Sequence, residues 1–317
     1  MRVAPIRRPA ALGAAALVLA LAVAGCSTAD GGAADPGTAD SAASGEAGEH
    51  SVEHARGTTE VPDDPQRVVV LEPVELDTAV ALGVTPVGAA VASNVAGIPA
   101  YLGVEGVQPV GTVPEPDLEA IAALKPDLIL GTESRHSALY DQLAAIAPTV
   151  FMATQADPWR ENVLLVGEAL NQRDAAADLV DGFDQRCEQI AAEFDVAGKT
   201  ANLIRPRDET TLSLYGPTSF GGGALECAGL TIPEQDWEDG LQADLSPENV
   251  QQAAADYVFV TTTDVNDPST IPAAISQNSA VFGSVTPVDT SYWVSGVGPK
   301  GGELVLDDIE QFLASQR

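Results

Sequence analysis

Two hydrophobic periods alternate along most of the chain. Short runs of large apolar residues at 68–70, 128–130 and 257–260 predict buried strands, and apolar residues spaced three or four apart between them predict helices. Such alternation indicates an α/β fold in which helices cover mostly parallel sheets. We predict further strands at 84–90, 149–152, 203–204 and 212–214, and helices at 73–82, 118–124, 138–146, 159–170, 221–228, 272–275 and 307–313.

One long helical stretch interrupts this alternation. From residue 173 to residue 194, Leu179, Phe183 and Ile190 keep one face apolar. At 1.5 Å per residue, about 20 residues of helix span about 30 Å, which is enough to connect two separate lobes. We therefore predict two α/β lobes at 54–172 and 197–317, with a connecting helix at 173–196.

A spaced pair of acids occurs once in each half. Glu119 opens a predicted helix and Asp127 opens the strand after it, and Glu248 and Asp256 repeat this arrangement 129 residues later. A helix followed by an acid and a strand is common, so the pair alone is a weak sign of duplication. Its place in matching helix and strand patterns favours two similar lobes.

The N-terminal segment has the pattern of a secretion signal. Arg2, Arg7 and Arg8 precede an apolar run at 10–24, which is short for a membrane span of about 20 residues. The small residues that lead to Cys26 resemble the lipobox of bacterial lipoproteins, which implies cleavage before Cys26 and acylation of its thiol. The alternative is an ordinary secretion signal followed by an incidental cysteine.

The next segment, 26–53, contains almost no large apolar side chain. Such a segment cannot bury enough surface to offset the entropy that ordering costs. We predict a disordered tether that holds the folded part at the extracytoplasmic face of the cell membrane through lipid on Cys26.

The charge of the chain is strongly acidic, at −31, and the predicted signal removes three arginines and no acid. This charge repels nucleic acid, which excludes DNA and RNA as partners. It also makes each of the remaining Lys and Arg residues a candidate for ligand contact. Cys187 and Cys227 lie in a compartment that permits disulfides, but free cysteine is also a common buried residue, so the sequence leaves their pairing open.

Several short segments carry a family resemblance when they are taken in order. They are 54–58, 65–69, 117–119, 124–130, 135–136, 139–140, 146–150, 214–215, 219–220, 245–248, Trp293 and 306–309. In this order, behind a lipobox, they resemble the siderophore and vitamin B12 substrate-binding proteins of ABC importers.

The resemblance implies the class III solute-binding fold, with two α/β lobes joined by a long helix. It implies a monomer without enzymatic activity or cofactor, which captures an Fe(III)–siderophore complex and delivers it to an ABC permease dimer with its ATPase. It also implies one exposed carboxylate on each lobe for docking, at the positions of Glu119 and Glu248. Both glutamates can equally stabilise the helix N-termini on which they lie.

The family holds its ligand in the cleft between the lobes with Arg, Tyr and Trp. Arg135 and Arg205 follow predicted strands, at the ends where α/β folds bind ligands. Tyr215 and Trp293 end predicted strands and are candidates for cleft lining or for the core. Further candidates are Tyr101 at the rim of the first lobe, Asn94 as a hydrogen-bond donor, and, less favoured, Arg160, Arg207 and Lys300.

The number of cations favours a particular ligand chemistry. Ile232 and Pro233 stand where the family often carries Arg-Pro, so one cation is missing. With few cations, a neutral hydroxamate siderophore is favoured over an anionic catecholate.

Three other classes of protein are alternatives to a siderophore-binding protein. A zinc or manganese receptor needs several histidines, whereas the predicted lobes contain His136 and the boundary residue His54. A haem or cobalamin receptor of the same fold stays open, because Tyr101 or His136 could ligate haem iron. An extracellular hydrolase is disfavoured, because the chain has neither a Gly-x-Ser-x-Gly nor a His-Glu-x-x-His motif.

Overall fold

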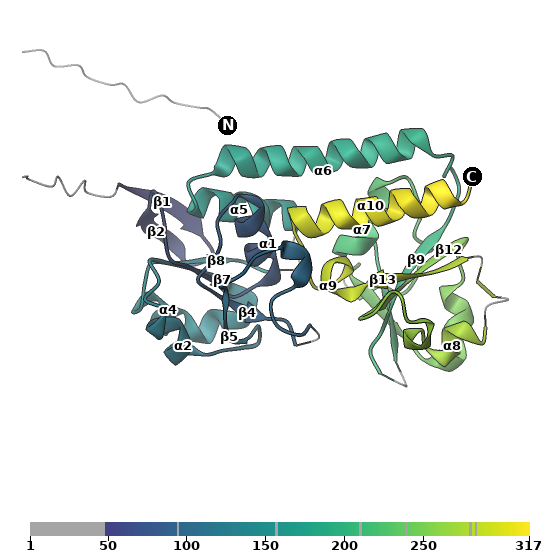
Figure 1. Cartoon of the computed structure of the whole chain (residues 1–317), viewed down its shortest axis with the longest axis horizontal. Helices are drawn as coiled ribbons and strands as arrows, with labels where there is room; N and C mark the ends of the chain where they lie inside the picture. Colours follow the sequence, from purple (N-terminus) through teal and green to yellow (C-terminus); the bar gives the residue numbers. More distant parts are fainter. Residues whose placement is uncertain are drawn as a thin grey trace, which may run out of the picture. The chain divides into compact units, whose positions relative to one another are not determined.

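The computed structural model describes residues 48–317 apart from Asn94, 156–157, 209–210, Asp239, 279–280 and Gly283 (Figure 1). The predicted signal, Cys26 and most of the predicted tether lie outside these residues, as does the candidate donor Asn94. None of the helices within them is both long and apolar enough to cross a bilayer.

A mostly parallel sheet forms the centre of the N-terminal lobe. Within the described ranges six strands pair in the order β6-β5-β4-β3-β7-β8, and β5 with β6 is the antiparallel pair. The valines of β3 (Val68–Val70) are buried, as expected for a central strand covered on both faces. The other elements are β4 (Gly88–Val91), β5 (Gln108–Thr112), β6 (Glu115–Pro116), β7 (Leu128–Thr132), β8 (Thr149–Met152), α1 (Pro73–Ala81), η1 (Ala100–Leu102), α2 (Leu118–Ala123), α3 (Glu133–His136), η2 (Ser137–Leu139), α4 (Tyr140–Ala144) and α5 (Trp159–Ala169).

An antiparallel hairpin of β1 (Glu49–His54) and β2 (Gly57–Pro62) precedes this sheet. The sequence predicts a disordered tether up to residue 53, and the structure differs because two residues anchor β1. The ring nitrogens of His50 lie 3.0 Å from Asp63 Oδ1 and 2.7 Å from the Glu168 carbonyl oxygen. Val52 is fully buried. A single apolar residue among polar neighbours gives too little pattern to reveal this strand.

The sheet of the C-terminal lobe is mixed. In the described residues five strands pair in the order β11-β10-β9-β12-β13, with β12 parallel to β9 and β13, and β10 antiparallel to β9 and β11. The sequence predicts mostly parallel sheets, and β9 and β10 are an antiparallel exception, because residues 207–211 are too few for the crossover that parallel strands need. The elements are β9 (Ala201–Pro206), β10 (Leu212–Tyr215), α7 (Phe220–Cys227), β11 (Gln242–Leu245), η3 (Pro247–Ala253), β12 (Tyr257–Thr262), η4 (Pro268–Thr270), α8 (Ala273–Ser276), β13 (Ser284–Asp289), α9 (Thr290–Trp293) and α10 (Pro299–Ser315).

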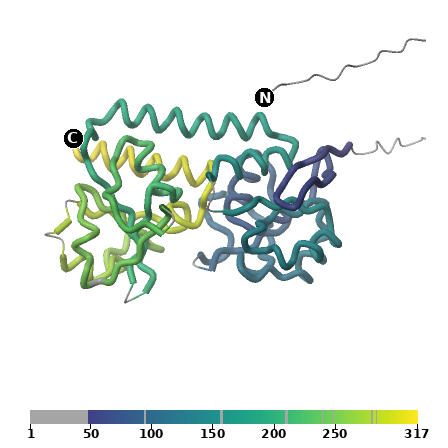
Figure 2. Tube along the Cα trace, turned by 180° about the vertical axis from the view of Figure 1, so that it is seen from behind, coloured from purple at the N-terminus to yellow at the C-terminus, as the bar shows by residue number. Residues whose placement is uncertain are grey.

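The long helix α6 (Arg173–Glu193) runs along both lobes (Figures 1 and 2). It packs on α5 of the N-terminal lobe and on α7 and α10 of the C-terminal lobe. Its buried residues recur three and four positions apart, which gives it one apolar face. A disulfide between Cys187 and Cys227, with a Cα–Cα distance of 5.3 Å, joins α6 to α7. The connecting helix is therefore covalently fixed to the C-terminal lobe.

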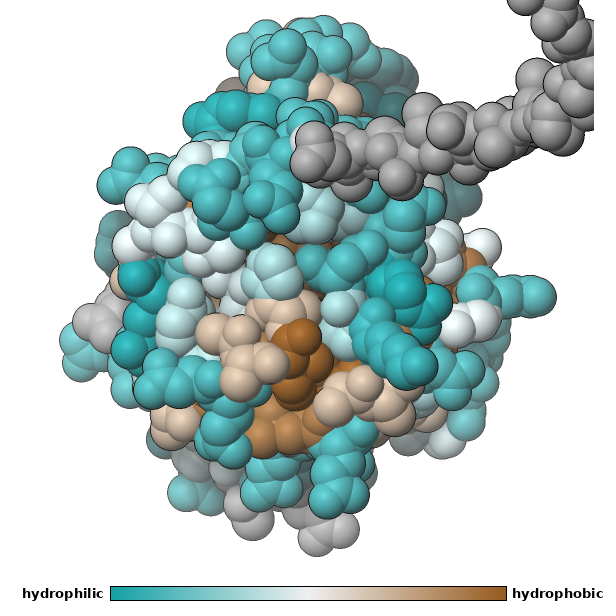
Figure 3. All heavy atoms as spheres, turned by 90° about the vertical axis from the view of Figure 1, so that its left-hand side faces the viewer, coloured by the Kyte–Doolittle hydropathy of each residue, from teal (hydrophilic) through white to brown (hydrophobic). Residues whose placement is uncertain are grey.

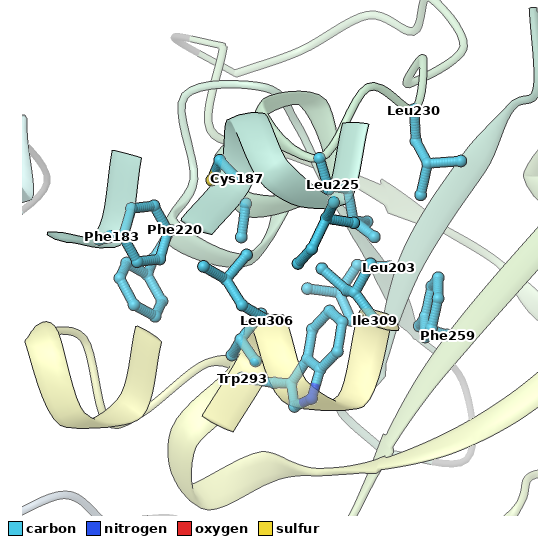
Figure 4. Close-up of a cluster of buried hydrophobic side chains, with 14 of the residues drawn as sticks. Phe183, Cys187, Leu203, Phe220, Leu225, Leu230, Phe259, Trp293, Leu306 and Ile309 are labelled. Atoms are coloured by element: carbon cyan, nitrogen blue, oxygen red, sulfur yellow. The ribbon is translucent and has the colours of Figure 1, made fainter. Parts of the chain in front are cut away.

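Large apolar side chains from α6, α7, α9 and α10 meet over the second sheet. Figure 4 shows Phe183, Phe220, Trp293, Leu306 and Ile309 in this cluster, which α5 joins through Trp159. The Trp159 ring lies edge-on to both Phe183 and Phe220, at centroid distances of 5.0 and 5.3 Å. The apolar core therefore continues from one lobe into the other beneath α6.

Each lobe ties two parallel strands together with one aspartate. The Asp127 carboxylate, just before β7, accepts from the backbone N–H groups of Gln66 and Arg67 at 2.8 Å each. The Asp256 carboxylate, just before β12, accepts from the backbone N–H and the hydroxyl of Thr200 at 2.9 and 3.0 Å. The paired acids of the sequence thus occupy equivalent places in the two lobes.

The end of the described part at the left of Figure 1 presents mostly hydrophilic side chains around a compact group of apolar ones (Figure 3).

In the C-terminal lobe, Val265 is the large apolar side chain that the structure describes as exposed, at 39%.

Candidate functional site

A cleft of about 1190 Å³ is lined by residues of both lobes. In the N-terminal lobe the lining residues follow the carboxyl ends of β3, β4, β5, β7 and β8, which is where α/β sheets bind ligands. Residues of β9, β10 and α7 line the other side. This volume lies at or above the upper end of the range of about 300–1,000 Å³ for small-molecule sites, so the cleft suits a large ligand.

Arg135 lines the cleft from α3, as the sequence predicted, and its charge is already paired. Its Nη1 donates to Glu72 Oε2 at 2.6 Å, and the Glu72 side chain is fully buried whereas that of Arg135 is 38% exposed. Burial raises the pKa of Glu72, and the charge of Arg135 opposes this shift. Burial and the nearby Glu72 together raise the pKa of Glu75 well above its ordinary value. At this wall of the cleft the positive charge of Arg135 is therefore paired with the carboxylate of Glu72.

The first turn of α5 contributes an aromatic and a second arginine. The Arg160 guanidinium lies 4.8 Å from the centroid of the Trp159 ring, a cation–π contact, and its Nε donates to Asp184 Oδ1 of α6 at 3.1 Å. We had not predicted Trp159 as a cleft residue. Its place just beyond the carboxyl end of a predicted strand was the available signal.

Arg205 and Arg207 line the opposite side from β9 and the turn after it. Arg205 Nη1 donates to the Tyr215 hydroxyl at 3.3 Å, and Arg207 donates to Ser213 Oγ and Gln242 Oε1 at 2.9 Å each. Their hydrogen-bond partners within the described residues are neutral. Tyr215, also a predicted lining residue, thus lies at the cleft wall beside Arg205.

Trp293 does not offer its side chain to a ligand. It lies in α9 rather than at the end of a strand, it is 0% exposed, and its ring stacks on Phe259 at a centroid distance of 5.1 Å. Its indole N–H donates to Asp308 Oδ2 at 2.8 Å. Trp293 is among the described residues that line the cleft, as the sequence predicted, but its indole N–H is already bonded to the half-buried Asp308.

Tyr101 is not one of the cleft-lining residues in the part of the chain that the structure describes. Its hydroxyl donates to the buried Asp77 Oδ2 at 2.8 Å, and its ring lies edge-on to Tyr292 at 5.8 Å. Lys300 is likewise engaged through its backbone N–H, which donates to Asp77 Oδ1 at 2.8 Å. Both residues belong to a contact between the lobes rather than to the cleft.

His136 is buried and has no free ring nitrogen. Its Nδ1 accepts from the Thr132 backbone N–H at 3.1 Å, so its Nε2 donates to the Val113 carbonyl at 2.7 Å. Burial lowers the pKa of His136, which keeps it neutral. His136 and Tyr101, the two residues that kept a haem ligand open, are therefore both occupied. No group of metal-ligating side chains occurs among the described residues.

Glu119 and Glu248 are both exposed and lie in the first turn of α2 and of the 3₁₀ helix η3. The cap of α2 is provided by Asp117, whose carboxylate accepts from the N–H groups of Glu119 and Ala120 at 3.0 Å. Glu119 is therefore not the residue that caps α2, and the N-cap residue of η3, Ser246, makes no side-chain cap hydrogen bond. Their side chains remain accessible to a partner.

Comparison with known proteins shows which proteins are similar to this chain. A model of the family described as Periplasmic binding protein matches residues 68–284. The probable siderophore-binding lipoprotein YfiY of Bacillus subtilis (strain 168) is 33% identical over 285 residues, which cover 83% of this chain and 87% of YfiY. The Fe(3+)-citrate-binding protein YfmC of the same organism is 28% identical, over 80% of this chain and 82% of YfmC.

The crystal structure of Staphylococcus aureus SirA complexed with staphyloferrin B matches with a TM-score of 0.70 at 28% identity, over 84% of this chain and 98% of SirA. The predicted two-lobed class III fold is confirmed. So is the expectation of a substrate-binding protein rather than an enzyme. The chain belongs to the periplasmic binding protein family.

Proposed function

We propose that this protein is the extracytoplasmic substrate-binding component of an ABC importer and that its cleft captures a ferric siderophore. The observation that carries this proposal is a cleft of about 1190 Å³ that collects arginines and aromatic side chains. A ferric siderophore already saturates its iron, so its receptor needs donors for ligand oxygens and flat apolar walls rather than metal ligands. The names of the relatives YfiY and YfmC support the same class of ligand.

The charge of the cleft points to an anionic chelate. Of the described residues that line it, four are arginines and two, Glu72 and Glu238, are acids. Arg135 and Arg160 are paired with Glu72 and Asp184, so Arg205 and Arg207 are the cations that favour an anionic ligand. The sequence favoured a neutral hydroxamate because cations are scarce in the chain, but a third of the Lys and Arg residues beyond the predicted signal gather at this one cleft. We therefore favour a ferric carboxylate-type chelate over a hydroxamate.

Titration separates these ligand classes. Trp159 lies at the cleft wall, so a bound ferric chelate should quench its fluorescence, and Trp159→Phe should lose most of that signal while the affinity measured by calorimetry changes little. Ferric carboxylate and hydroxamate chelates, haem, cobalamin and Zn²⁺ are compared in one buffer. Saturation by haem, cobalamin or Zn²⁺ without any ferric chelate would contradict the proposal.

Glu119 and Glu248 are proposed to dock the loaded protein, as a monomer, on a permease dimer with its ATPase. Exposed carboxylates that pair with arginines fix orientation through charge-assisted hydrogen bonds. Glu119→Ala with Glu248→Ala should abolish uptake of labelled iron chelate by cells and leave chelate affinity unchanged. Glu105→Ala with Glu303→Ala removes two other exposed acids and should leave uptake intact. Undiminished uptake in the first variant would remove the docking assignment.

We also propose that residues 1–25 are removed, that Cys26 carries lipid, and that the segment up to the hairpin is the tether. Cys26→Ala should move the protein from the membrane fraction to the medium or periplasm and stop the incorporation of labelled palmitate. Membrane retention of the variant would contradict this anchor.

A further inference from the structure

A buried aspartate of the N-terminal lobe caps a helix of the other lobe. Asp77 lies in α1 and is 0% exposed. Its Oδ1 accepts from the Lys300 N–H and its Oδ2 from the Gly301 N–H, both at 2.8 Å. These N–H groups belong to the first turn of α10, where helices leave backbone donors without intrahelical partners. The N-cap residue of α10 is Gly298, which has no side chain to satisfy them.

Tyr101 completes this contact from η1. Its hydroxyl donates to Asp77 Oδ2 at 2.8 Å. Burial, followed by the nearby charge of Asp77, raises the pKa of Tyr101, so the hydroxyl stays protonated and able to donate. Three donors among the described residues thus converge on one carboxylate, and charge-assisted hydrogen bonds of this kind are about twice as strong as neutral ones. We call these four residues, Asp77, Tyr101, Lys300 and Gly301, the interlobe contact.

Two glycines allow the chains to approach so closely. A Cβ atom at Gly298 would lie 2.5 Å from Asp77 Oδ1, and one at Gly296 would clash with the Tyr101 hydroxyl oxygen. Gly298 also has φ of 148°, which favours glycine. Any side chain at these positions would push the lobes apart, so the loop before α10 is suited to this contact.

The interlobe contact adjoins the cleft on both of its sides. Glu72, Pro73 and Val74, at the start of α1, line the cleft about one turn from Asp77. On the other side 294–295 and Val297, just before α10, line it as well. A bond that holds α1 against the start of α10 therefore fixes two opposing segments of the cleft wall relative to one another.

We propose that Asp77 is a positioning residue that sets the spacing of the two lobes and so holds the cleft at the width its ligand requires. The ligand part of this inference rests on the proposed function, whereas the part about lobe spacing does not. The α6 helix joins the lobes along one side, and Asp77 joins them next to the cleft.

The variants separate positioning from general stability. Asp77→Ala removes both acceptors, Asp77→Asn keeps the volume but turns an amide donor toward one backbone N–H, and Tyr101→Phe removes a single donor. Thr78→Val is the matched control, because Thr78 is a buried neighbour in α1 whose hydroxyl has no hydrogen-bond partner among the described residues. Burial raises the pKa of Asp77 to about 7, so the measurements are made at pH 8.5, where the carboxylate is ionised.

The first readout needs no ligand. Spin labels on non-natural amino acids at positions 105 and 251, one in each lobe, report the interlobe distance distribution by double electron–electron resonance and leave the disulfide intact. Asp77→Ala should broaden or lengthen this distribution and speed hydrogen exchange of the Lys300 and Gly301 amides, with helix content retained. Asp77→Asn should lie between it and the wild type, and Thr78→Val should match the wild type.

The second readout is affinity for a ferric carboxylate chelate, which should fall about tenfold in Asp77→Ala, mainly through faster dissociation. A folded Asp77→Ala or Asp77→Asn variant with the wild-type distance distribution and exchange rates would overturn the inference, even if the chelate binds. If Asp77→Ala does not fold, Asp77→Asn decides. If the wild type binds no ferric chelate, the proposed function fails, and the distance measurement still tests the interlobe contact.

Discussion

The two lobes both present arginines to the cleft, but they partner them differently. In the N-terminal lobe Arg135 is bonded to the buried Glu72 at 2.6 Å, and Arg160 of α5 is bonded to Asp184. In the C-terminal lobe the described hydrogen-bond partners of Arg205 and Arg207 are the neutral side chains of a tyrosine, a serine and a glutamine. A guanidinium that already faces a carboxylate has little charge left to offer, so we expect the anionic part of a ligand to bind the C-terminal lobe.

The largest expected effect follows from this asymmetry. Arg205→Gln with Arg207→Gln removes the two cleft arginines whose hydrogen-bond partners among the described residues are neutral. Because hydrogen bonds to charged groups contribute about 1.5–3 kcal/mol each, affinity for an anionic ferric chelate should fall about 100-fold or more. Isothermal titration calorimetry measures the change.

The matched control changes the other lobe. Glu72→Gln with Arg135→Gln removes a compensated pair together, so no buried charge is left alone, and affinity should fall about tenfold at most. An equal or larger loss in this second variant would show that the two lobes do not differ as their arginine partners indicate.

The disulfide distinguishes the lobes as well, because it fixes α6 to the C-terminal side. Cys187→Ser with Cys227→Ser should lower the free energy of unfolding by about 2–4 kcal/mol, since the cross-link restricts the unfolded chain. Urea denaturation measures the loss. Hydrogen exchange should rise more in α7 than in the sheet of the N-terminal lobe, and a uniform rise would contradict a local role.

The paired aspartates test where the lobes are alike. Asp127→Ala and Asp256→Ala should each lower the free energy of unfolding by a small and similar amount, because each removes the acceptor of two donors at a strand start that water can still reach. Chemical denaturation of the two variants gives the comparison. A clear loss of stability in one variant and none in the other would contradict the structural equivalence.

The smallest effect concerns pH. All three histidines of the sequence lie before the C-terminal lobe. Burial lowers the pKa of His136 from 6.5. The unfolded chain therefore takes up a proton near pH 6.5 that the folded state resists, and this part of the stability is lost as pH falls below about 6.5. His136→Gln should flatten the fall of melting temperature between pH 7 and 5. The same slope in variant and wild type would mean that His136 protonates without cost.

The sequence predicted much of the fold because its strands and helices carry strong periodicity. The strand at 149–152 has the predicted bounds, and the long helix begins where expected. In the structure α10 begins at Pro299, whereas the sequence predicts this helix only from residue 307. The prediction starts too late because two glycines interrupt the helical pattern. They are there for close packing: a Cβ atom at Gly302 would lie 2.9 Å from Phe183.

The candidate site was harder to predict, because partners distant in sequence decide where a polar tip points. Arg135, Arg205 and Tyr215 follow strand ends and lie at the cleft. Trp293, at the end of a predicted strand, and Tyr101, after a turn, were further candidates, but their polar groups donate hydrogen bonds to Asp308 and Asp77. Periodicity predicts the face of a helix or strand on which a side chain lies. It does not predict that a carboxylate on another element will accept a hydrogen bond from that side chain.

The proposed specificity depends on the arginines of the C-terminal lobe, which should select an anionic ferric chelate. The most direct measurement is calorimetry of the chain without residues 1–25, with Cys26→Ala, against a ferric carboxylate chelate and a neutral ferric hydroxamate at low and high salt. We predict at least about tenfold tighter binding of the anionic chelate, weakening as salt screens the half-buried Arg205 and the exposed Arg207. Equal or tighter binding of the neutral chelate, insensitive to salt, would contradict the account.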